Sequence, residues 1–329
     1  MGARSYRCAV LTALIAAVSA GAAPAAAQTY PSRPITLVVP FPPGGSATII
    51  ARIIADKMSE GLGQQIVVDN RGGAGGSIAA RQVAKSAPDG ATLLLAFTGT
   101  LAVSPLIFAN VGYDPRKDFA GVGLIGMAPS VLAVNPSVPA HSVADLIGIA
   151  KAEPGKIQYG SPGIGTTNHL AGELLAAMTG IKITHIPYKG TGPAITDLLG
   201  GHIAMMFAPI PAAHGNVSAG ALRALGVTSL KRSSLWPDIP TVAETGLPGF
   251  EVVQRSTLLA PAGTPKEIVD RLAREMNKAV ESGALRDRLK AAATEIELLT
   301  GTPEAFRAHI QKEIPHWRGV IRAANIPLE

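Results

Sequence analysis

Four short loops in this sequence concentrate backbone N–H and hydroxyl donors. The first, PFPPGGSAT (40–48), stands between the apolar run ITLVV and the amphipathic segment IIARIIADKM, and the others are TGT (98–100), SPGIGTT (161–167) and KGTG (189–192). A glycine-rich turn that enters a helix presents unpaired N–H groups and the positive end of the helix dipole. Together the loops indicate a site for an anion, a phosphate or a carboxylate, although any one of them alone is equally compatible with an ordinary cap or turn.

The residue spacing argues against a nucleotide phosphate. A P-loop needs a lysine after its last glycine, and GGSATIIA contains none. A dinucleotide fingerprint needs G-x-G-x-x-G, but GIGTTN (163–168) ends in Asn168 where the third glycine should stand. The pattern therefore favours a carboxylate, which several backbone and hydroxyl donors can hold together.

The sequence lacks the usual patterns for catalysis and for metal binding. No G-x-S-x-G elbow occurs, and the nearest string, YGSPG, puts Ser161 directly after Gly160. The seven histidines form no H-E-x-x-H pair. His169 and His214 either line a cleft or are solvated or capping histidines, and the second interpretation is the simpler one. We therefore expect a binding protein without enzymatic activity, metal or cofactor.

The donor loops recur at regular places in an alternation of strands and helices, which indicates an α/β protein with a mainly parallel sheet. ITLVV (35–39), QIVVDN (65–70) and ATLLLAF (91–97) are expected strands of a first lobe, and a helix is expected from 46 to 62. The pattern restarts at SVLAVNP, and QYGS repeats the strand, loop and helix of the opening stretch. Because ligands bind at the carboxyl ends of such strands, we expect two lobes with a ligand cleft between them.

The first 27 residues have the form of a secretory signal. Arg4 and Arg7 precede an apolar core, and Ala25 and Ala27 offer a small-residue cleavage pattern, so we expect export with cleavage near Ala27. A membrane anchor is the alternative, but the apolar run is shorter than the roughly 20 residues of a span. Cleavage removes the only cysteine and leaves a chain long enough for two domains. A net charge of +6 with 4% aromatic residues does not suit a nucleic-acid surface.

Several strings, in order along the chain, together resemble the Bug family, the periplasmic receptors of tripartite tricarboxylate transporters. They include YPSRPITLVVPFPPGGSA, VVDNRGGAGGSIAA, HIPYKGTGPAITDLLGG and DIPTVAETGLPGFE, and they cover nearly all of the chain beyond the signal. The resemblance implies an α/β periplasmic binding protein fold of type II, with two lobes, a ligand cleft and hinge crossovers near 125–130 and 250–257. It implies a discontinuous domain 1 (28–127 plus 252–329) and a domain 2 (128–251).

The same resemblance implies how a ligand is held and used. Family members trap small carboxylates in the cleft, with one carboxylate held by two loops that correspond to 41–48 and 161–169 here. We therefore expect a monomeric receptor that serves membrane permease subunits; the alternative is a sensor that reports the ligand to a signalling partner. The expected ligand-binding residues are Phe41, Gly44, Gly45, Ser46, Thr48, Thr98, Thr100, Ser161, Gly165, Thr166, Thr167, His169, Ala208 and Arg255.

Three acids of the family pattern are missing from this chain. GGSAD reads GGSAT here, which puts Thr48 in place of an acid, and GGQVDLMFD reads GGHIAMMFA, which puts Ala204 and Ala208 in place of two more. In amino-acid-binding relatives the acid at the Ala208 position is the expected partner of the ligand's ammonium. We therefore expect Ala208 at the cleft wall and a ligand without an amino group. Arg255 either faces the cleft and favours a dicarboxylate or an aromatic acid, or points to solvent on the outer face of its strand.

Overall fold

The computed structural model describes residues 30–292, 296–299, 301–323 and 326, so the expected signal segment 1–27 lies outside the described residues. Contacts divide the chain into Met1–Ser32 and Arg33–Glu329, and the second part, which contains every element named below, is described by itself. Within the described residues, no helix combines the length and the apolar character that a membrane span requires.

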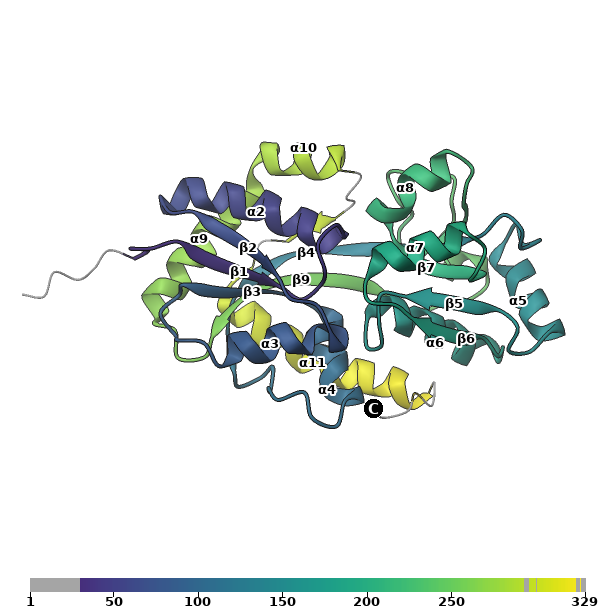
Figure 1. The fold of residues 1–329 in the computed structure, drawn as a ribbon, viewed down its shortest axis with the longest axis horizontal. Helices are drawn as coiled ribbons and strands as arrows, with labels where there is room; N and C mark the ends of the chain where they lie inside the picture. The colour runs from purple at the N-terminus through teal and green to yellow at the C-terminus, as the bar shows by residue number, and fades with distance from the viewer. Residues whose placement is uncertain (1–29, 293–295, 300, 324–325, 327–329) are drawn as a thin grey trace, which may run out of the picture. The chain divides into compact units, whose positions relative to one another are not determined.

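Strands and helices alternate through the second part (Figure 1). The strands are β1 (Ile35–Val39), β2 (Ile66–Asn70), β3 (Thr92–Phe97), β4 (Phe119–Val134), β5 (Gln158–Ser161), β6 (Thr184–Pro187), β7 (Met205–Pro209), β8 (Arg223–Val227), β9 (Val253–Pro261) and β10 (Glu297–Leu298). The helices are α2 (Ser46–Leu62), α3 (Ser77–Ala84), α4 (Ser104–Ile107), α5 (Val143–Ala152), α6 (Thr167–Thr179), α7 (Thr191–Leu199), α8 (Ile210–Ser218), α9 (Lys266–Glu281), α10 (Gly283–Ala291) and α11 (Pro303–Ala323), with short turns η1 (Ala74–Gly76), η2 (Gly99–Val103) and η3 (Ala243–Thr245).

The strands form one mixed sheet with two regions that share β4. The first region has the order β2-β1-β3-β9-β4, and the second has the order β4-β7-β5-β6; β10 and β8 also pair with β4. β4 pairs with β9 as far as Pro129 and with β7 from Ser130 onward. A single strand of 16 residues therefore carries the chain between the regions, where the sequence pattern predicted a new strand at SVLAVNP.

The expectation of a mainly parallel sheet is wrong at the centre. β4 leaves the first region and β9 returns to it, so these two adjacent crossings run antiparallel. The outer pairs, β1 with β2 and β3, and β5 with β6 and β7, are parallel, as short strand–helix–strand units require. The two crossing strands lie close to the positions expected for the hinge.

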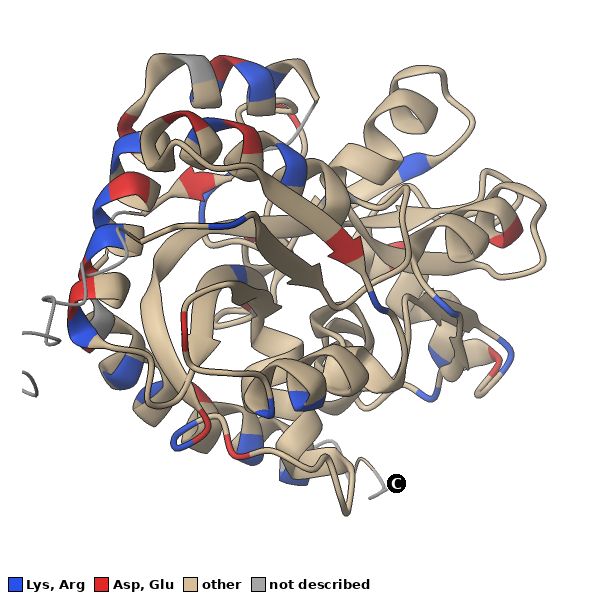
Figure 2. Ribbon diagram, turned by 60° about the vertical axis from the view of Figure 1, so that its left-hand side comes forward, with Lys and Arg blue, Asp and Glu red and all other residues tan. Residues whose placement is uncertain are grey.

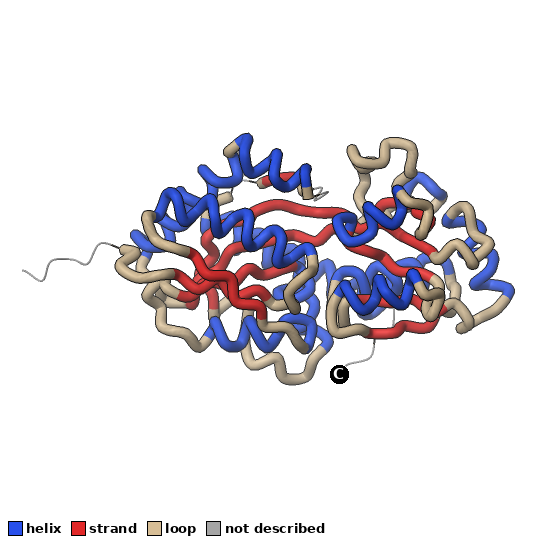
Figure 3. The backbone as a smooth tube through the Cα atoms, turned by 45° about the horizontal axis from the view of Figure 1, so that its top comes forward, coloured by secondary structure: helices blue, strands red, loops and turns tan. Residues whose placement is uncertain are grey.

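Apolar runs explain which residues form the strands and which faces the helices cover. β3 is buried from Leu93 to Phe97, which suits a strand with helices on both faces. Figure 3 shows helices on both sides of the strands in each region. One apolar cluster includes Leu94 of β3, Trp317 of α11 and Leu170 of α6, so the C-terminal helix packs against elements of both regions.

Charged residues are concentrated on the outer helices, as an amphipathic pattern predicts. Both signs alternate along α9 and α10 (Figure 2), while α9 buries Val269, Leu272 and Met276 on its other face. The sequence pattern missed α8, whose first turn contains Pro211 and whose middle contains Gly215. A proline in the first turn is tolerated because the N–H groups there have no partner within the helix.

Candidate functional site

A small pocket lies where loops from both sheet regions meet. Its volume is about 140 Å³. We call it the helix-end pocket, and it is lined by Phe41, Pro42, Pro43, Gly44, Gly45, Ala47, Pro162, Asn168, Lys189, Gly190, Thr191, Gly192, Pro193, Pro209 and Gln254. The first region contributes the β1–α2 loop and one residue of β9. The second region contributes the starts of α6, α7 and α8.

The four helices α2, α6, α7 and α8 begin at this pocket. None of these four has an acidic residue in its first turn, and only α6 is capped by a side chain, that of Thr166. The first N–H groups of a helix have no partner within the helix. The pocket wall therefore offers N–H donors and the positive ends of several helix dipoles, which is an environment for an anion.

Among the described residues that line the helix-end pocket, Lys189 is the only charged one, and it is exposed. The buried Asn168 is fixed by its own hydrogen bonds, because its Nδ2 donates to Ser130 Oγ (3.0 Å) and to the carbonyl of Phe207 (2.6 Å). An ammonium group in this pocket would meet a cation and no carboxylate, whereas a carboxylate would meet donors and a positive charge.

A larger pocket of about 570 Å³ adjoins the first. We call it the apolar pocket, and it is lined by Phe41, Pro42, Pro43, Asn70, Gly72, Gly73, Ala74, Gly75, Gly76, Phe108, Pro162, Gly163, Ile164, Pro187, Tyr188, Lys189 and Gly190. The two pockets share residues of the β1–α2 loop, Pro162, Lys189 and Gly190. Their common wall makes them neighbouring chambers of one candidate site.

Three of the expected residues in the first loop line the helix-end pocket. Phe41, Gly44 and Gly45 line the helix-end pocket, and the next residue begins α2 at Ser46. Thr48 is buried instead, and its Oγ1 accepts a hydrogen bond from Asn70 Nδ2 (2.8 Å), which also donates to the carbonyl of Phe41 (2.8 Å). Through Asn70, Thr48 therefore stabilises the conformation of the β1–α2 loop without lining the pocket itself.

Thr98 and Thr100 line neither pocket. Both are buried: Thr98 Oγ1 accepts from the backbone N–H of Arg255 (3.1 Å), and Thr100 Oγ1 donates to the carbonyl of Gly75 (3.1 Å). Neither hydroxyl faces a pocket in this structure, because each one joins two segments of the first region.

In the loop from β5 into α6, the residues that line the helix-end pocket are not the expected ones. Pro162 and Asn168 line the helix-end pocket, while Ser161 is fully buried and accepts from the N–H of Gly163 (3.2 Å). The N–H of Gly165 donates to His169 Nδ1 (3.3 Å). These contacts position the loop behind the pocket wall.

Thr166 and Thr167 begin α6, and their hydroxyls also have protein partners. Thr166 Oγ1 accepts from the N–H of His169 (3.3 Å) and donates to the carbonyl of Gly163 (2.8 Å). Thr167 Oγ1 donates to Gln254 Oε1 (3.3 Å), a contact between the second region and β9. Thr167 thereby connects α6 to the returning crossing strand.

For two expected residues, Ala208 and Arg255, the neighbouring residue of the strand lines the helix-end pocket instead. Ala208 is fully buried in an apolar cluster with Val131 and Ala194, and its neighbour Pro209 lines the helix-end pocket. Arg255 forms an ion pair with Glu313, and its neighbour Gln254 lines the pocket. Successive residues of a strand face opposite sides of the sheet, so in each pair only one residue can face the pocket.

The residues that sequence reasoning missed come mainly from the KGTG loop. Its donor-rich character was a usable signal, and Lys189, Gly190, Thr191 and Gly192 all line the helix-end pocket. Gln254 had no such signal, because only the register of β9 shows which residue of the crossing strand faces the site.

A buried cluster of titratable side chains lies behind the β5–α6 loop. The rings of His169 and His185 stack at 4.1 Å between centroids, and that of Tyr159 stacks on His185 at 4.8 Å. A hydrogen bond of 2.7 Å joins Ser161 Oγ to His185 Nε2, and the Tyr159 hydroxyl donates to Glu173 Oε1 (2.5 Å). The buried His169 and the partly buried His185 thus hold both ends of the loop, contrary to the simpler expectation of a solvated or capping His169.

Burial keeps both histidines neutral near neutral pH. Desolvation, with a smaller effect of the neighbouring His185, lowers the pKa of His169 to about 3, and desolvation lowers the pKa of His185 to about 4. Burial also raises the pKa of Glu173 above its usual value. The 3.8 Å contact between His169 Nε2 and Glu173 Oε1 is therefore not an ion pair at neutral pH.

These depressed pKa values predict a loss of stability in mild acid. In the unfolded chain both histidines bind a proton below about pH 6.5. In the folded chain His185 binds a proton only below about pH 4 and His169 only below about pH 3. The free energy of unfolding should be highest above about pH 6.5. It should fall by about 2 kcal/mol for His169 alone between about pH 7 and pH 5.

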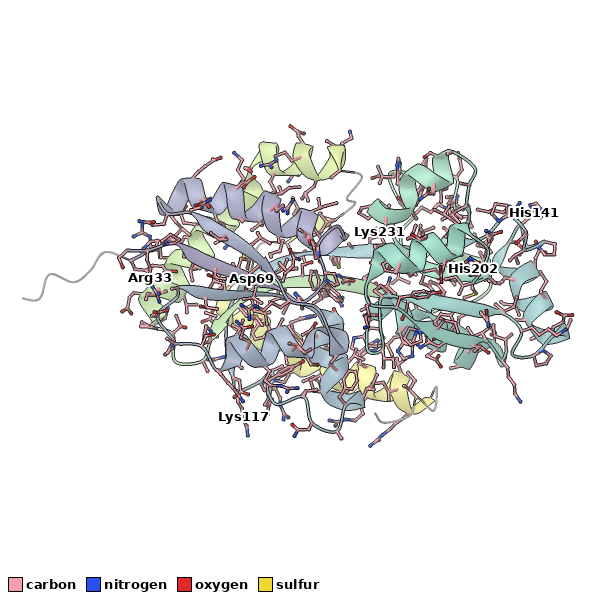
Figure 4. All side chains as sticks on the ribbon, in the orientation of Figure 1. Arg33, Asp69, Lys117, His141, His202 and Lys231 are labelled. Carbon is pink, nitrogen blue, oxygen red and sulfur yellow. The ribbon has the colours of Figure 1, made fainter. Side chains whose placement is uncertain are left out.

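Chemical denaturation at several pH values measures this slope. His169→Asn, whose side-chain oxygen can still accept from the N–H of Gly165, should show a shallower loss than wild type. His202→Asn is the matched control, because His202 is exposed on the turn before β7 (Figure 4). Equal slopes for wild type and His169→Asn would contradict a neutral, buried His169.

The chain matches the model of the tripartite tricarboxylate transporter family receptor over residues 50–326. It is 41% identical over 310 residues to the protein BugT of Bordetella pertussis (strain Tohama I), covering 94% of each chain. Its fold superposes on the structure of R. palustris Rpa4515 with adipate with a TM-score of 0.86, at 40% identity over 91% of this chain and 99% of the other.

A second structure with a bound acid is also similar. MatC (Rpa3494) from Rhodopseudomonas palustris with bound malate has a TM-score of 0.82 and 32% identity, over 89% of this chain and 100% of the other. The fold is thus the α/β periplasmic solute-binding fold, and family and fold alike are those of receptors. The chain belongs to the tripartite tricarboxylate transporter receptor family, whose members are periplasmic solute-binding proteins.

Proposed function

We propose that this protein is an exported receptor that binds a small organic carboxylate without an amino group in the helix-end pocket. Residues 1–27 direct its export and are removed near Ala27. The monomeric receptor then delivers its ligand to the membrane permease subunits of a tripartite tricarboxylate transporter. It uses no cofactor and carries out no reaction on the ligand.

One observation carries this proposal: four helices begin at the helix-end pocket, beside Lys189, and none of them has an acidic residue in its first turn. Each hydrogen bond from such a donor to an ionised carboxylate contributes about 1.5–3 kcal/mol. A carboxylate is planar and accepts through both oxygens, so it can use donors from more than one helix start at once. Adipate and malate, bound to the two similar structures, are carboxylates without an amino group.

The two crossing strands supply a mechanism for capture. We propose that 28–127 plus 252–329 and 128–251 act as two domains that close on the ligand by bending at β4 and β9. The helix-end pocket contains residues of both, and the contact of Thr167 with Gln254 would form as they close. The closed form is the one that a permease would recognise.

Binding without turnover is the test of this function. Purified protein should show a higher melting temperature with a matching di- or monocarboxylate, because the native form binds it and the unfolded chain does not. Lys189→Met should weaken that carboxylate's affinity up to about fivefold by calorimetry, the effect of one exposed charge, about 1 kcal/mol. Lys182→Met, another exposed lysine outside both pockets, is the control.

Two outcomes would contradict the proposal. The first is consumption of the carboxylate by purified protein with no other enzyme present, since a receptor returns its ligand unchanged. The second is a tight complex with an amino acid whose carboxylate-only analogue binds weakly, because the described residues that line the helix-end pocket offer no carboxylate to an ammonium group.

A further inference from the structure

The apolar pocket has a larger volume than a single carboxylate group needs. Small-molecule sites commonly enclose about 300–1,000 Å³, and the helix-end pocket, at about 140 Å³, is below this range. The apolar pocket, at about 570 Å³, is within it. A ligand whose carboxylate fills the first chamber must therefore place any sizeable remainder in the second.

The walls of the apolar pocket suit hydrocarbon. Phe41, Phe108, Ile164 and several prolines line it, and its two uncharged polar side chains, Asn70 and Tyr188, already have protein partners. The Tyr188 hydroxyl donates to Asp197 Oδ2 (2.7 Å), and Asn70 Nδ2 donates within the first region. The side chains of Asn70 and Tyr188 are therefore not open to a polar ligand body, and the aromatic, isoleucine and proline side chains offer contacts to an apolar one.

Phe108 is held in place between loops of both sheet regions. A Cβ built at Gly75 or at Gly165 would lie 3.5 Å from Phe108 Cε2, and one at Gly75 would also lie 2.8 Å from the carbonyl oxygen of Ile164. A side chain at Gly75 would therefore displace the opposite loop at Ile164, while either Cβ would come into van der Waals contact with the ring. The glycines thus let a fixed aromatic ring form one wall of the chamber.

We propose that the apolar pocket is a second subsite, which binds the hydrocarbon body of an acid longer than a four-carbon chain. This inference rests on the proposed function, since the acid's carboxylate occupies the helix-end pocket. Gly73 and Ala74, which line the apolar pocket and not the helix-end pocket, are exposed, so a second carboxylate at the far end of the chain remains hydrated there.

Calorimetry with succinate, adipate and suberate tests the subsite. Each buried methylene should strengthen binding up to about fourfold, the equivalent of about 0.8 kcal/mol. Wild type should therefore bind adipate about tenfold more tightly than succinate. Phe108→Ala should reduce this ratio at least about threefold, because the ring that the chain contacts is removed. Met178→Ala, an exposed residue outside both pockets, should keep the wild-type ratio.

A second measurement needs no variant. Burial of apolar surface makes the heat-capacity change of binding more negative, so that change should be more negative for suberate than for succinate in wild type. A ratio unchanged in folded Phe108→Ala, or equal heat-capacity changes for the two acids, would overturn the subsite while the proposed receptor function stands. Failure of wild type to bind any of the three acids would overturn this inference, whereas the proposed function is overturned by the two outcomes named for it above.

Discussion

Gly45→Val is expected to weaken carboxylate binding at least tenfold, about 1.4 kcal/mol, in a protein that stays folded. Gly45 lines the helix-end pocket and immediately precedes α2. Its φ of −89° is accessible to any residue, and a Cβ there would meet no protein atom within 4 Å. The added side chain therefore enters space that the ligand needs and covers the N–H groups at the start of α2.

The stability cost of Gly45→Val should stay within about 1 kcal/mol, the difference between glycine and a poor N-cap residue. Calorimetry gives the affinity and thermal unfolding gives the stability. Gly148→Val is the matched control, because Gly148 is exposed on α5 and a Cβ there also meets nothing within 4 Å. Wild-type affinity in folded Gly45→Val would make the glycine-rich stretch a structural turn and no more.

Local patterns predicted the parts of the fold that depend on local chemistry. Continuous apolar runs such as ITLVV and ATLLLAF become buried strands, and the glycine-rich stretch after the first of them does enter a helix. The family resemblance, the solute-binding fold and the receptor class are confirmed by the comparisons. The predicted domain boundaries remain a prediction.

The differences between the expected site residues and the pocket-lining ones share a physical cause, because tertiary packing sets strand register and distant hydrogen bonds. Whether Ala208 or Pro209 faces the pocket depends on how β7 pairs with β4. The Thr98 hydroxyl accepts a hydrogen bond from the backbone N–H of Arg255, which is 157 residues away in the sequence. Nothing in the sequence near Thr98 indicates this partner. Sequence located the donor loops, while packing decided which donors remain open to a ligand.

Arg255 illustrates the same point with a large consequence for stability. Arg255 Nη1 lies 2.9 Å from Glu313 Oε1, with side-chain exposures of 25% and 11%. Glu313 Oε2 also accepts from Trp317 Nε1 (3.0 Å), so this carboxylate joins β9 to two positions on α11. The pair therefore fastens the C-terminal helix to the returning crossing strand.

Arg255→Ala should lower the free energy of unfolding by about 1–3 kcal/mol, because it leaves the largely buried Glu313 carboxylate without its cation. This range is below the cost of breaking a fully buried pair, since Arg255 is partly exposed to solvent. Carboxylate affinity should stay within about twofold of wild type, because Arg255 lines neither pocket.

A double-mutant cycle separates the pair from the packing of the arginine stem. Glu313→Gln removes the charge but can still accept from Trp317 Nε1, so adding it to Arg255→Ala should recover part of the lost stability. Chemical denaturation of the single and double variants, with calorimetry on each, measures both properties. If Arg255→Ala instead kept wild-type stability and lost a preference for dicarboxylates, Arg255 would contact the ligand, and the Glu313 pair would have to open when the ligand binds.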